Sequence, residues 1–157
     1  MNIFNISEIV ELGIEKEKKR RDFYSLCAER FKGNKEIGEL FGKLRDWEET
    51  HIEKFSGIKA SIKEAPETES YEGEMSSYMQ ALLDDKLYKE VSPERFSASV
   101  KTALDAISYG IGFEKDSIIF FNELINFTAD SRKEIVKKLI DEEKQHIIYL
   151  ALLKQKI

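Results

Sequence analysis

Two ten-residue segments of the chain, DWEETHIEKF at 46–55 and DEEKQHIIYL at 141–150, align without a gap and share a Glu-x-x-His motif. On an α-helix, residues three apart project from the same face. Glu143 and His146 share their face with apolar residues whose spacing predicts a protein core. These are Val136, Leu139, Ile140, Ile147 and Leu150. The fold must therefore accommodate a carboxylate and an imidazole that point inward, in two copies.

The repeat extends upstream of both motifs. EKKRRDFY at 17–24 aligns with EKDSIIFF at 114–121, and in each segment a Glu precedes an aromatic residue by seven positions. Seven residues are two helical turns, so each pair lies on one face. An offset of about 95 residues between the copies is too long for a solenoid. The pattern favours two helical hairpins related by a pseudo-twofold axis.

Composition supports a helical, single-domain protein of residues 1–157. The chain has 157 residues, only two Pro and eight Gly, and a charged fraction of 35%. Its net charge of −5 argues against an electrostatic nucleic-acid binder, and the run KEKKRR at 16–21 is interpreted as a solvated helix face. Cys27 is the sole cysteine, which excludes an intrachain disulfide. We find no signal peptide and no membrane-spanning stretch, and expect a cytoplasmic protein.

Apolar periodicity predicts four long helices and one short one. Capping and breaking residues set their ends: Asn34 and Ser92 as caps, Gly57 as a stop, and a capping box from Ser131 to Glu134. The predicted ranges are 6–32, 35–56, 74–89 (short), 93–127 and 132–155. Short turns pair the first long helix with the second and the third with the fourth. A connection of about 40 residues joins the pairs, as in all-α, ferritin-like four-helix bundles with one long crossover.

In such a bundle each half supplies one Glu from its first helix and a Glu-x-x-His from its second. The six side chains are Glu17, Glu48, His51, Glu114, Glu143 and His146. Four carboxylates in a dry core are costly unless their charge is compensated, and two divalent cations supply four positive charges. The same ligand set is known from di-iron and di-manganese carboxylate proteins. The set suits both metals, so the residues by themselves leave two Fe ions and two Mn ions as alternatives.

These motifs make the chain resemble the rubrerythrin branch of the ferritin-like diiron carboxylate proteins, over essentially its whole length. The resemblance implies that the six residues are iron ligands, with Glu48 and Glu143 bridging both ions. Glu17 with His51, and Glu114 with His146, would complete the two terminal sets. It further implies reduction of peroxide or O2. Electrons would come from a separate donor protein, because the sequence shows no rubredoxin domain, and a homodimer is the family expectation.

Residues beside the ligands carry further expectations. By the resemblance, Tyr24 hydrogen-bonds a ligand or transfers an electron; the alternative is an ordinary core tyrosine. Arg20 stands where the family more often has a small residue, and is expected to pair with a ligand carboxylate or an anion. Ser117 stands where well-known rubrerythrins carry an additional Glu, which weakens the expectation of peroxidase activity. Cys27 and Trp47 are interpreted as packing residues.

The sequence is also compatible with two hypotheses other than a redox enzyme. The first is an iron-binding or ferroxidase-like iron-handling protein without turnover. The second is a metal-free helical scaffold, in which the carboxyl groups would be protonated or bridged by water. A metal site predicts that chelation lowers the melting temperature, whereas a metal-free scaffold predicts no change.

Overall fold

The protein is seen in a computed structural model that describes residues 6–62, 81, 92–128 and 130–157. Its long helices are α1 (Ile6–Arg30), α2 (Lys35–Ile62), α5 (Ala103–Leu124) and α6 (Lys133–Lys156). A short helix, α4 (Pro93–Ser99), precedes α5, and two 3₁₀ turns, η2 (Ile125–Phe127) and η3 (Asp130–Arg132), precede α6. These residues contain no strand, so the predicted all-α class is confirmed.

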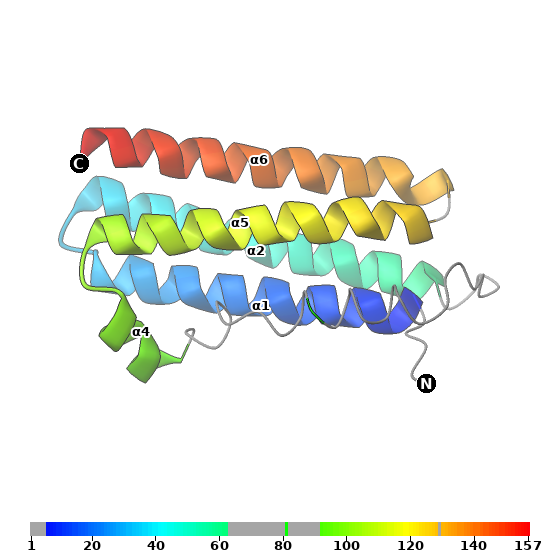
Figure 1. The fold of residues 1–157 in the computed structure, drawn as a ribbon, viewed down its shortest axis with the longest axis horizontal. Coiled ribbons are helices and arrows are strands. Elements are labelled where there is room, and N and C mark those ends of the chain that lie inside the picture. The colour runs from blue at the N-terminus through cyan, green and yellow to red at the C-terminus, as the bar shows by residue number, and fades with distance from the viewer. Residues whose placement is uncertain (1–5, 63–80, 82–91, 129) are drawn as a thin grey trace.

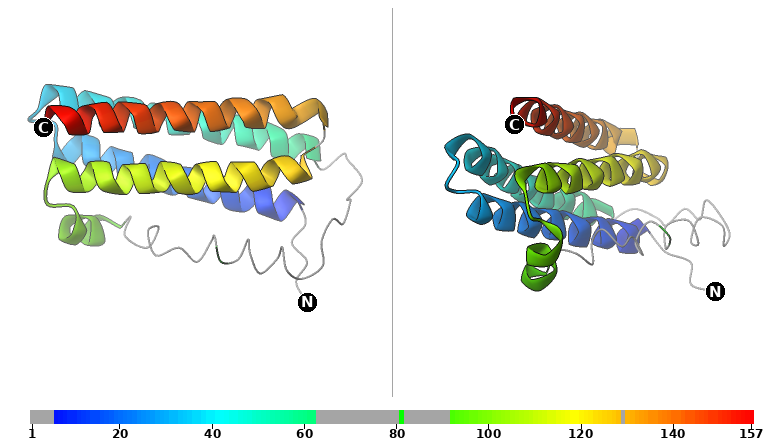
Figure 2. Two further views of the ribbon diagram at one scale, coloured as in Figure 1. Left: turned by 45° about the horizontal axis from the view of Figure 1, so that its top comes forward. Right: turned by 60° about the vertical axis from the view of Figure 1, so that its left-hand side comes forward.

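The four long helices lie side by side as two antiparallel hairpins, α1–α2 and α5–α6 (Figures 1 and 2). Helix α1 also packs against α5, and α2 against α6. Helix α2 ends at the opposite end of the bundle from the start of α5 (Figure 1). The four-helix bundle with one long crossover is thereby confirmed. The short helix predicted at 74–89 lies outside the described residues.

Two apolar clusters fill the bundle, one on either side of its middle. The Tyr24 cluster includes Phe23, Tyr24, Cys27, Phe41, Leu44, Ile107, Phe113 and Leu150. The Phe55 cluster includes Val10, Ile14, Phe55, Ile58, Phe120, Phe121, Leu124 and Leu139. On every long helix the predicted ligands fall between residues of the two clusters. The polar side chains therefore lie midway along the bundle, with apolar packing above and below.

Helix α2 continues past the predicted stop at Gly57 and ends at Ile62. A glycine inside a helix costs about 1 kcal/mol relative to alanine. Ile58 lies one position beyond it, is only 1% exposed and joins the Phe55 cluster. Burial of an isoleucine side chain contributes about 1.5–3 kcal/mol, which exceeds the cost of the glycine. Tertiary packing thus overrides the local signal.

The prediction of one unbroken helix from 93 to 127 is wrong. The chain leaves helical geometry between α4 and α5, with Val100 and Thr102 extended. Thr102 and Asp105 form a capping box: the Asp105 amide donates to the Thr102 hydroxyl at 3.2 Å, and the Thr102 amide donates to the Asp105 carboxylate at 2.9 Å. Ser92 caps α4 as predicted, through a hydrogen bond from the Arg95 amide. Apolar residues recur at helical spacing both before and after the break, so the sequence pattern did not reveal the separate start of α5.

At the other boundaries one predicted cap is present and one is not. The Asn34 side chain accepts a hydrogen bond from the Ile37 amide at 3.2 Å, as expected of a cap on α2. The capping box predicted from Ser131 is absent, because Ser131 lies within the 3₁₀ turn that leads into α6. The residue at the cap position is Arg132, which makes no side-chain capping bond.

Replacing Thr102 by Ala should lower the free energy of unfolding by about 1 kcal/mol, the usual contribution of a Ser or Thr cap. The capping bond to the start of α5 would be lost while the buried core stays unchanged. Urea unfolding followed by circular dichroism measures the difference. Thr50→Ala is the matched control, because the Thr50 hydroxyl bonds only a carbonyl inside α2. An equal loss in both variants would contradict a capping role.

Candidate metal centre

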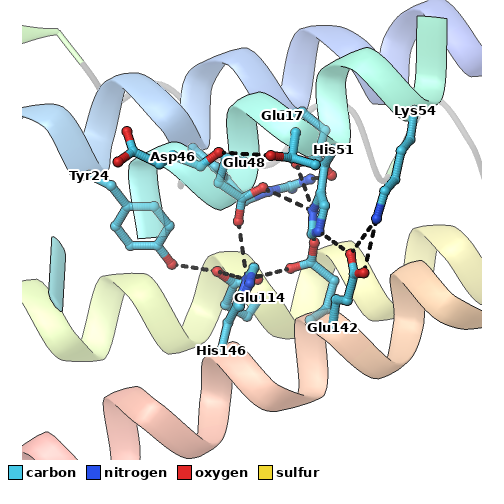
Figure 3. A network of polar contacts seen from close by, with 12 residues as sticks. Glu17, Tyr24, Asp46, Glu48, His51, Lys54, Glu114, Glu142 and His146 are labelled. Atoms are coloured by element: carbon cyan, nitrogen blue, oxygen red, sulfur yellow. Dashed lines mark hydrogen bonds and ion pairs between the residues drawn. The ribbon is translucent and has the colours of Figure 1, made fainter. Parts of the chain in front are cut away.

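The six predicted ligands converge in the middle of the bundle, with side chains from all four long helices pointing toward one another (Figure 3). Each is at most 3% exposed. Glu17 comes from α1 and Glu114 from α5, while α2 and α6 each supply a Glu-x-x-His pair. The structure confirms the prediction from helical spacing that these residues lie on the inner faces of the helices.

Glu48 and Glu143 each present one carboxylate oxygen to each histidine. Glu48 Oε2 lies 3.5 Å from His51 Nδ1, and its Oε1 lies 3.4 Å from His146 Nδ1. Glu143 Oε1 lies 2.6 Å from His51 Nδ1, and its Oε2 lies 3.6 Å from His146 Nδ1. The two carboxylates therefore stand between the two imidazoles, which is the arrangement required of groups that bridge two ions.

Glu17 and Glu114 flank the centre on opposite sides. Glu17 Oε2 lies 3.8 Å from His51 Nδ1, and Glu114 Oε1 lies 3.3 Å from His146 Nδ1. Two groups of ligand atoms result, each with all its atoms within 4.8 Å of one another. One comprises Glu17, Glu48, His51 and Glu143; the other comprises Glu48, Glu114, Glu143 and His146. Both groups contain the same two central carboxylates.

The donor atoms fit a pair of divalent cations. Each of the six residues has at least one buried oxygen or nitrogen at the centre without a hydrogen bond of regular geometry: Glu17 Oε2, both oxygens of Glu48 and of Glu143, Glu114 Oε2, and Nδ1 of His51 and His146. The shortest contact between two of these atoms is the ion pair of Glu143 Oε1 with His51 Nδ1. Buried polar atoms without partners are costly and rare in folded proteins. Carboxylate oxygens and imidazole nitrogens are the ligands that iron and manganese bind. Metal ions would satisfy these orphaned atoms.

Protons compensate much of the negative charge when no metal is bound. Burial raises the pKa of Glu17 to about 7, despite the opposing effect of Arg20. Burial opposes a charge on His146, but its contact with Glu143 raises the pKa to about 9. For His51, burial is likewise outweighed by the nearby carboxylates, and the pKa lies above its usual value. The cluster thus carries charges that cations and protons must balance.

Tyr24 belongs to the centre as well as to the apolar core. Its hydroxyl donates a hydrogen bond to Glu114 Oε1 at 2.6 Å, as predicted for contact with a ligand residue. Burial raises the pKa of Tyr24 well above its usual value, so the hydroxyl keeps its proton. Gly110 makes room for this ring, because an added Cβ would lie 3.3 Å from Tyr24 Cε1. The aligned residue of the other half, Phe121, stacks on Phe55 instead.

Arg20 is buried within the centre and donates a hydrogen bond to Glu17. Its Nε also lies 3.8 Å from Glu48 Oε2. The predicted pairing with a ligand carboxylate is thereby confirmed. Lys16 corrects the interpretation of 16–21 as a solvated face: it is 4% exposed and forms an ion pair of 2.9 Å with Asp116 of α5. Charge pairing explains why both cations are buried: Lys16 pairs with a residue of the other hairpin, and Arg20 pairs within its own hairpin.

Sequence reasoning missed the residues that hold the histidines from outside. The Glu142 carboxylate accepts a hydrogen bond from His51 Nε2 at 2.7 Å and is itself held by Lys54 Nζ at 2.9 Å (Figure 3). The Trp47 ring stacks on His146 with centroids 5.2 Å apart and an interplanar angle of 11°. Trp47 and Glu142 align in the repeat. The alignment could have identified these two residues, because each contacts the histidine of the opposite hairpin.

A surface hollow of about 280 Å³ between α2 and α6 reaches both histidines. Its lining residues are Trp47, Thr50, His51, Lys54, Glu142, Gln145, His146 and Tyr149. Cys27, by contrast, is fully buried, and burial raises the pKa of its thiol. The hollow therefore offers a small molecule an approach to the centre, whereas Cys27 is a packed core residue as predicted.

Comparisons with known proteins place the chain in a family. The rubrerythrin family model matches residues 8–154. A solved structure from Thermotoga maritima, provisionally described as a ferritin-like diiron-carboxylate protein, aligns with 27% identity and a TM-score of 0.66. That alignment covers 99% of this chain and 97% of the other. No curated protein matches, and no helix in the described ranges is long and apolar enough to cross a membrane. The chain has a ferritin-like fold and belongs to the rubrerythrin family.

Proposed function

We propose that the protein is a diiron-carboxylate oxidoreductase that reduces peroxide or O2 with electrons from a separate donor protein. The observation that carries the proposal is the pair of four-residue groups that share Glu48 and Glu143. Two ferrous ions held together can deliver two electrons to one oxidant, one from each ion. When bound, the iron pair would supply those electrons, and the protein would fix the pair and leave room for the oxidant.

In this proposal the six side chains hold the metal. Glu48 and Glu143 would be shared by the two ions, Glu17 and His51 would hold one ion, and Glu114 and His146 would hold the other. Both histidines already turn Nδ1 toward the carboxylates. A manganese pair would use the same residues, because the ligand types do not separate the two metals.

Residues around the ligands orient them and control access. Glu142 fixes the His51 ring by accepting from Nε2, which leaves Nδ1 directed inward. Tyr24 holds Glu114 through a hydrogen bond in which its hydroxyl oxygen lies 2.6 Å from the carboxylate oxygen. The apolar clusters exclude water from the two ends of the centre. A small oxidant would enter through the hollow between α2 and α6.

The proposal is tested by mixing the anaerobic ferrous protein with peroxide, and separately with O2, in a stopped-flow spectrometer. We expect oxidation faster than that of free Fe(II), and repeated turnover when a reductant is supplied. Oxidation no faster than that of free Fe(II) would contradict the enzyme. A single stoichiometric oxidation without turnover would favour the second candidate, an iron-handling protein. Ser117 favours that candidate, since it places an unbonded hydroxyl where a further carboxylate would serve peroxide chemistry.

Removing Glu142 should weaken metal binding by about 10- to 100-fold without changing the number of ions bound, because residues that orient a metal-binding histidine have effects of that size. Glu142→Ala takes away the acceptor for His51 Nε2 and leaves every proposed ligand in place. Glu49→Ala is the control: Glu49 pairs with Arg21 on the surface. Isothermal titration with Mn²⁺ measures the affinity. Equal affinities in the two variants would show that Glu142 does not position His51.

A further inference from the structure

The two halves of the centre differ at the residue one helical turn after each outer glutamate. In the α1 segment this residue is Arg20, and at the aligned position of α5 it is Ser117. Both side chains are nearly fully buried, at 2% and 1% exposure. The two groups otherwise have the same composition, three glutamates and one histidine each. The charge of Arg20 is therefore a built-in difference between two sites that have the same types of ligand residue.

Contacts place that charge on one side of the centre. Arg20 donates to Glu17, and its Nε lies 3.8 Å from Glu48 Oε2. Glu48 Oε2 is the oxygen nearer to His51, whereas Oε1 is nearer to His146. Both carboxylate groups that Arg20 approaches thus belong to the group containing His51. On the other side, the outer glutamate Glu114 accepts a hydrogen bond from the neutral hydroxyl of Tyr24 in place of a guanidinium.

We propose that Arg20 makes the two metal positions unequal, so that a divalent cation binds first among Glu48, Glu114, Glu143 and His146, and more weakly among Glu17, Glu48, His51 and Glu143. The inference rests on the two-ion centre proposed above. A buried guanidinium repels a nearby cation, and low-dielectric surroundings screen this repulsion poorly. It also occupies one oxygen of Glu17. The Tyr24 hydroxyl likewise occupies one oxygen of Glu114, but it adds no positive charge.

An anaerobic titration with Co²⁺ separates the two positions, because its visible absorption reports coordination as each ion binds. We expect two steps whose dissociation constants differ by at least about tenfold, the effect of a modest electrostatic difference at a poorly screened site. His146→Ala should remove the tighter step, and His51→Ala should remove the weaker one. Two steps of equal affinity, or loss of the tighter step in His51→Ala, would overturn the inference while leaving a two-ion centre intact.

Variants of Arg20 test the cause. Arg20→Ser installs the residue found at the aligned position, and Arg20→Gln keeps a hydrogen-bond donor for Glu17 without the charge. Each should tighten the weaker step by at least about tenfold, whereas Arg20→Lys should keep the two steps apart. Arg21→Ser is the matched control, because it removes a neighbouring arginine that pairs with Glu49 at the surface. An unchanged gap in Arg20→Gln, or an equal effect of Arg21→Ser, would show that contact with Arg20 does not cause the inequality. Absence of Co²⁺ binding in the wild-type protein would instead contradict the metal centre itself.

Discussion

Loading the metal-free protein with divalent ions is expected to raise its melting temperature by about 10 °C or more. A ligand that binds only the folded state stabilises it by about 4 kcal/mol when its free concentration is a thousand times its dissociation constant. For a chain of this size each kcal/mol shifts the melting temperature by about 2–4 °C. The unfolded chain cannot gather ligands that come from four helices, so binding is tied to folding.

Thermal unfolding followed by circular dichroism, with Mn²⁺ and then with excess chelator, measures this shift. Glu48→Ala should lose it, because one of the two shared carboxylates is removed. Glu49→Ala should keep it, although the two residues are neighbours on α2, because Glu49 lies at the surface beside Arg21. The same melting temperature with metal and with chelator would contradict a metal centre and favour a metal-free scaffold.

Glu143→Leu should have opposite consequences in the metal-free and metal-loaded states. Glu143 is fully buried, is repelled by Glu17 and Glu48, and pairs through Oε1 with His51 at 2.6 Å. Removing one partner of a buried ion pair is destabilising only when the other charge is left without compensation. Replacing Glu143 by an apolar residue of similar size relieves the repulsion, and His51 can release its proton, so that no buried charge is left unpaired. The metal-free variant should therefore be at least as stable as the wild type. It should nevertheless gain nothing from added metal, since both groups lose a shared ligand.

Urea unfolding with and without Mn²⁺ tests this pair of expectations. Leu139→Ala, one turn earlier on the same helix, is the control for packing and should cost about 2–5 kcal/mol in either condition. If Glu143→Leu destabilised the metal-free protein as strongly as Leu139→Ala, the carboxylate would have a structural role. A full metal-induced stabilisation in Glu143→Leu would contradict its place as a bridging ligand.

The bundle and the convergence of the six side chains were predictable because both follow from helical periodicity. Glu48 and His51 share a face with Leu44 and Phe55, so burial of that face carries the polar pair inward. The internal repeat then predicts the partner of each motif: the Glu-x-x-His of one half faces the Glu-x-x-His of the other half. The sequence therefore predicts well which residues of one helix lie on its buried face, because helical spacing alone determines this.

Other features depend on contacts between elements and were not predictable from one stretch of sequence. Helix α2 passes Gly57 because Ile58 packs into a cluster built from all four long helices. Lys16 is buried because Asp116, on another hairpin, pairs with it. Glu142 serves His51 across the interface between α2 and α6. In each case the decisive partner is distant in the chain, so the residue pattern of one helix does not identify it.

The most direct test of the proposed centre is the metal content of the protein after anaerobic reconstitution with Fe(II). Elemental analysis should give two irons per chain for the wild type and a loss of that iron in the double variant Glu48→Ala/Glu143→Ala, which lacks both shared carboxylates. Absence of bound iron in the wild type, or equal binding in the double variant, would contradict the centre, and the proposed oxidoreductase would fall with it.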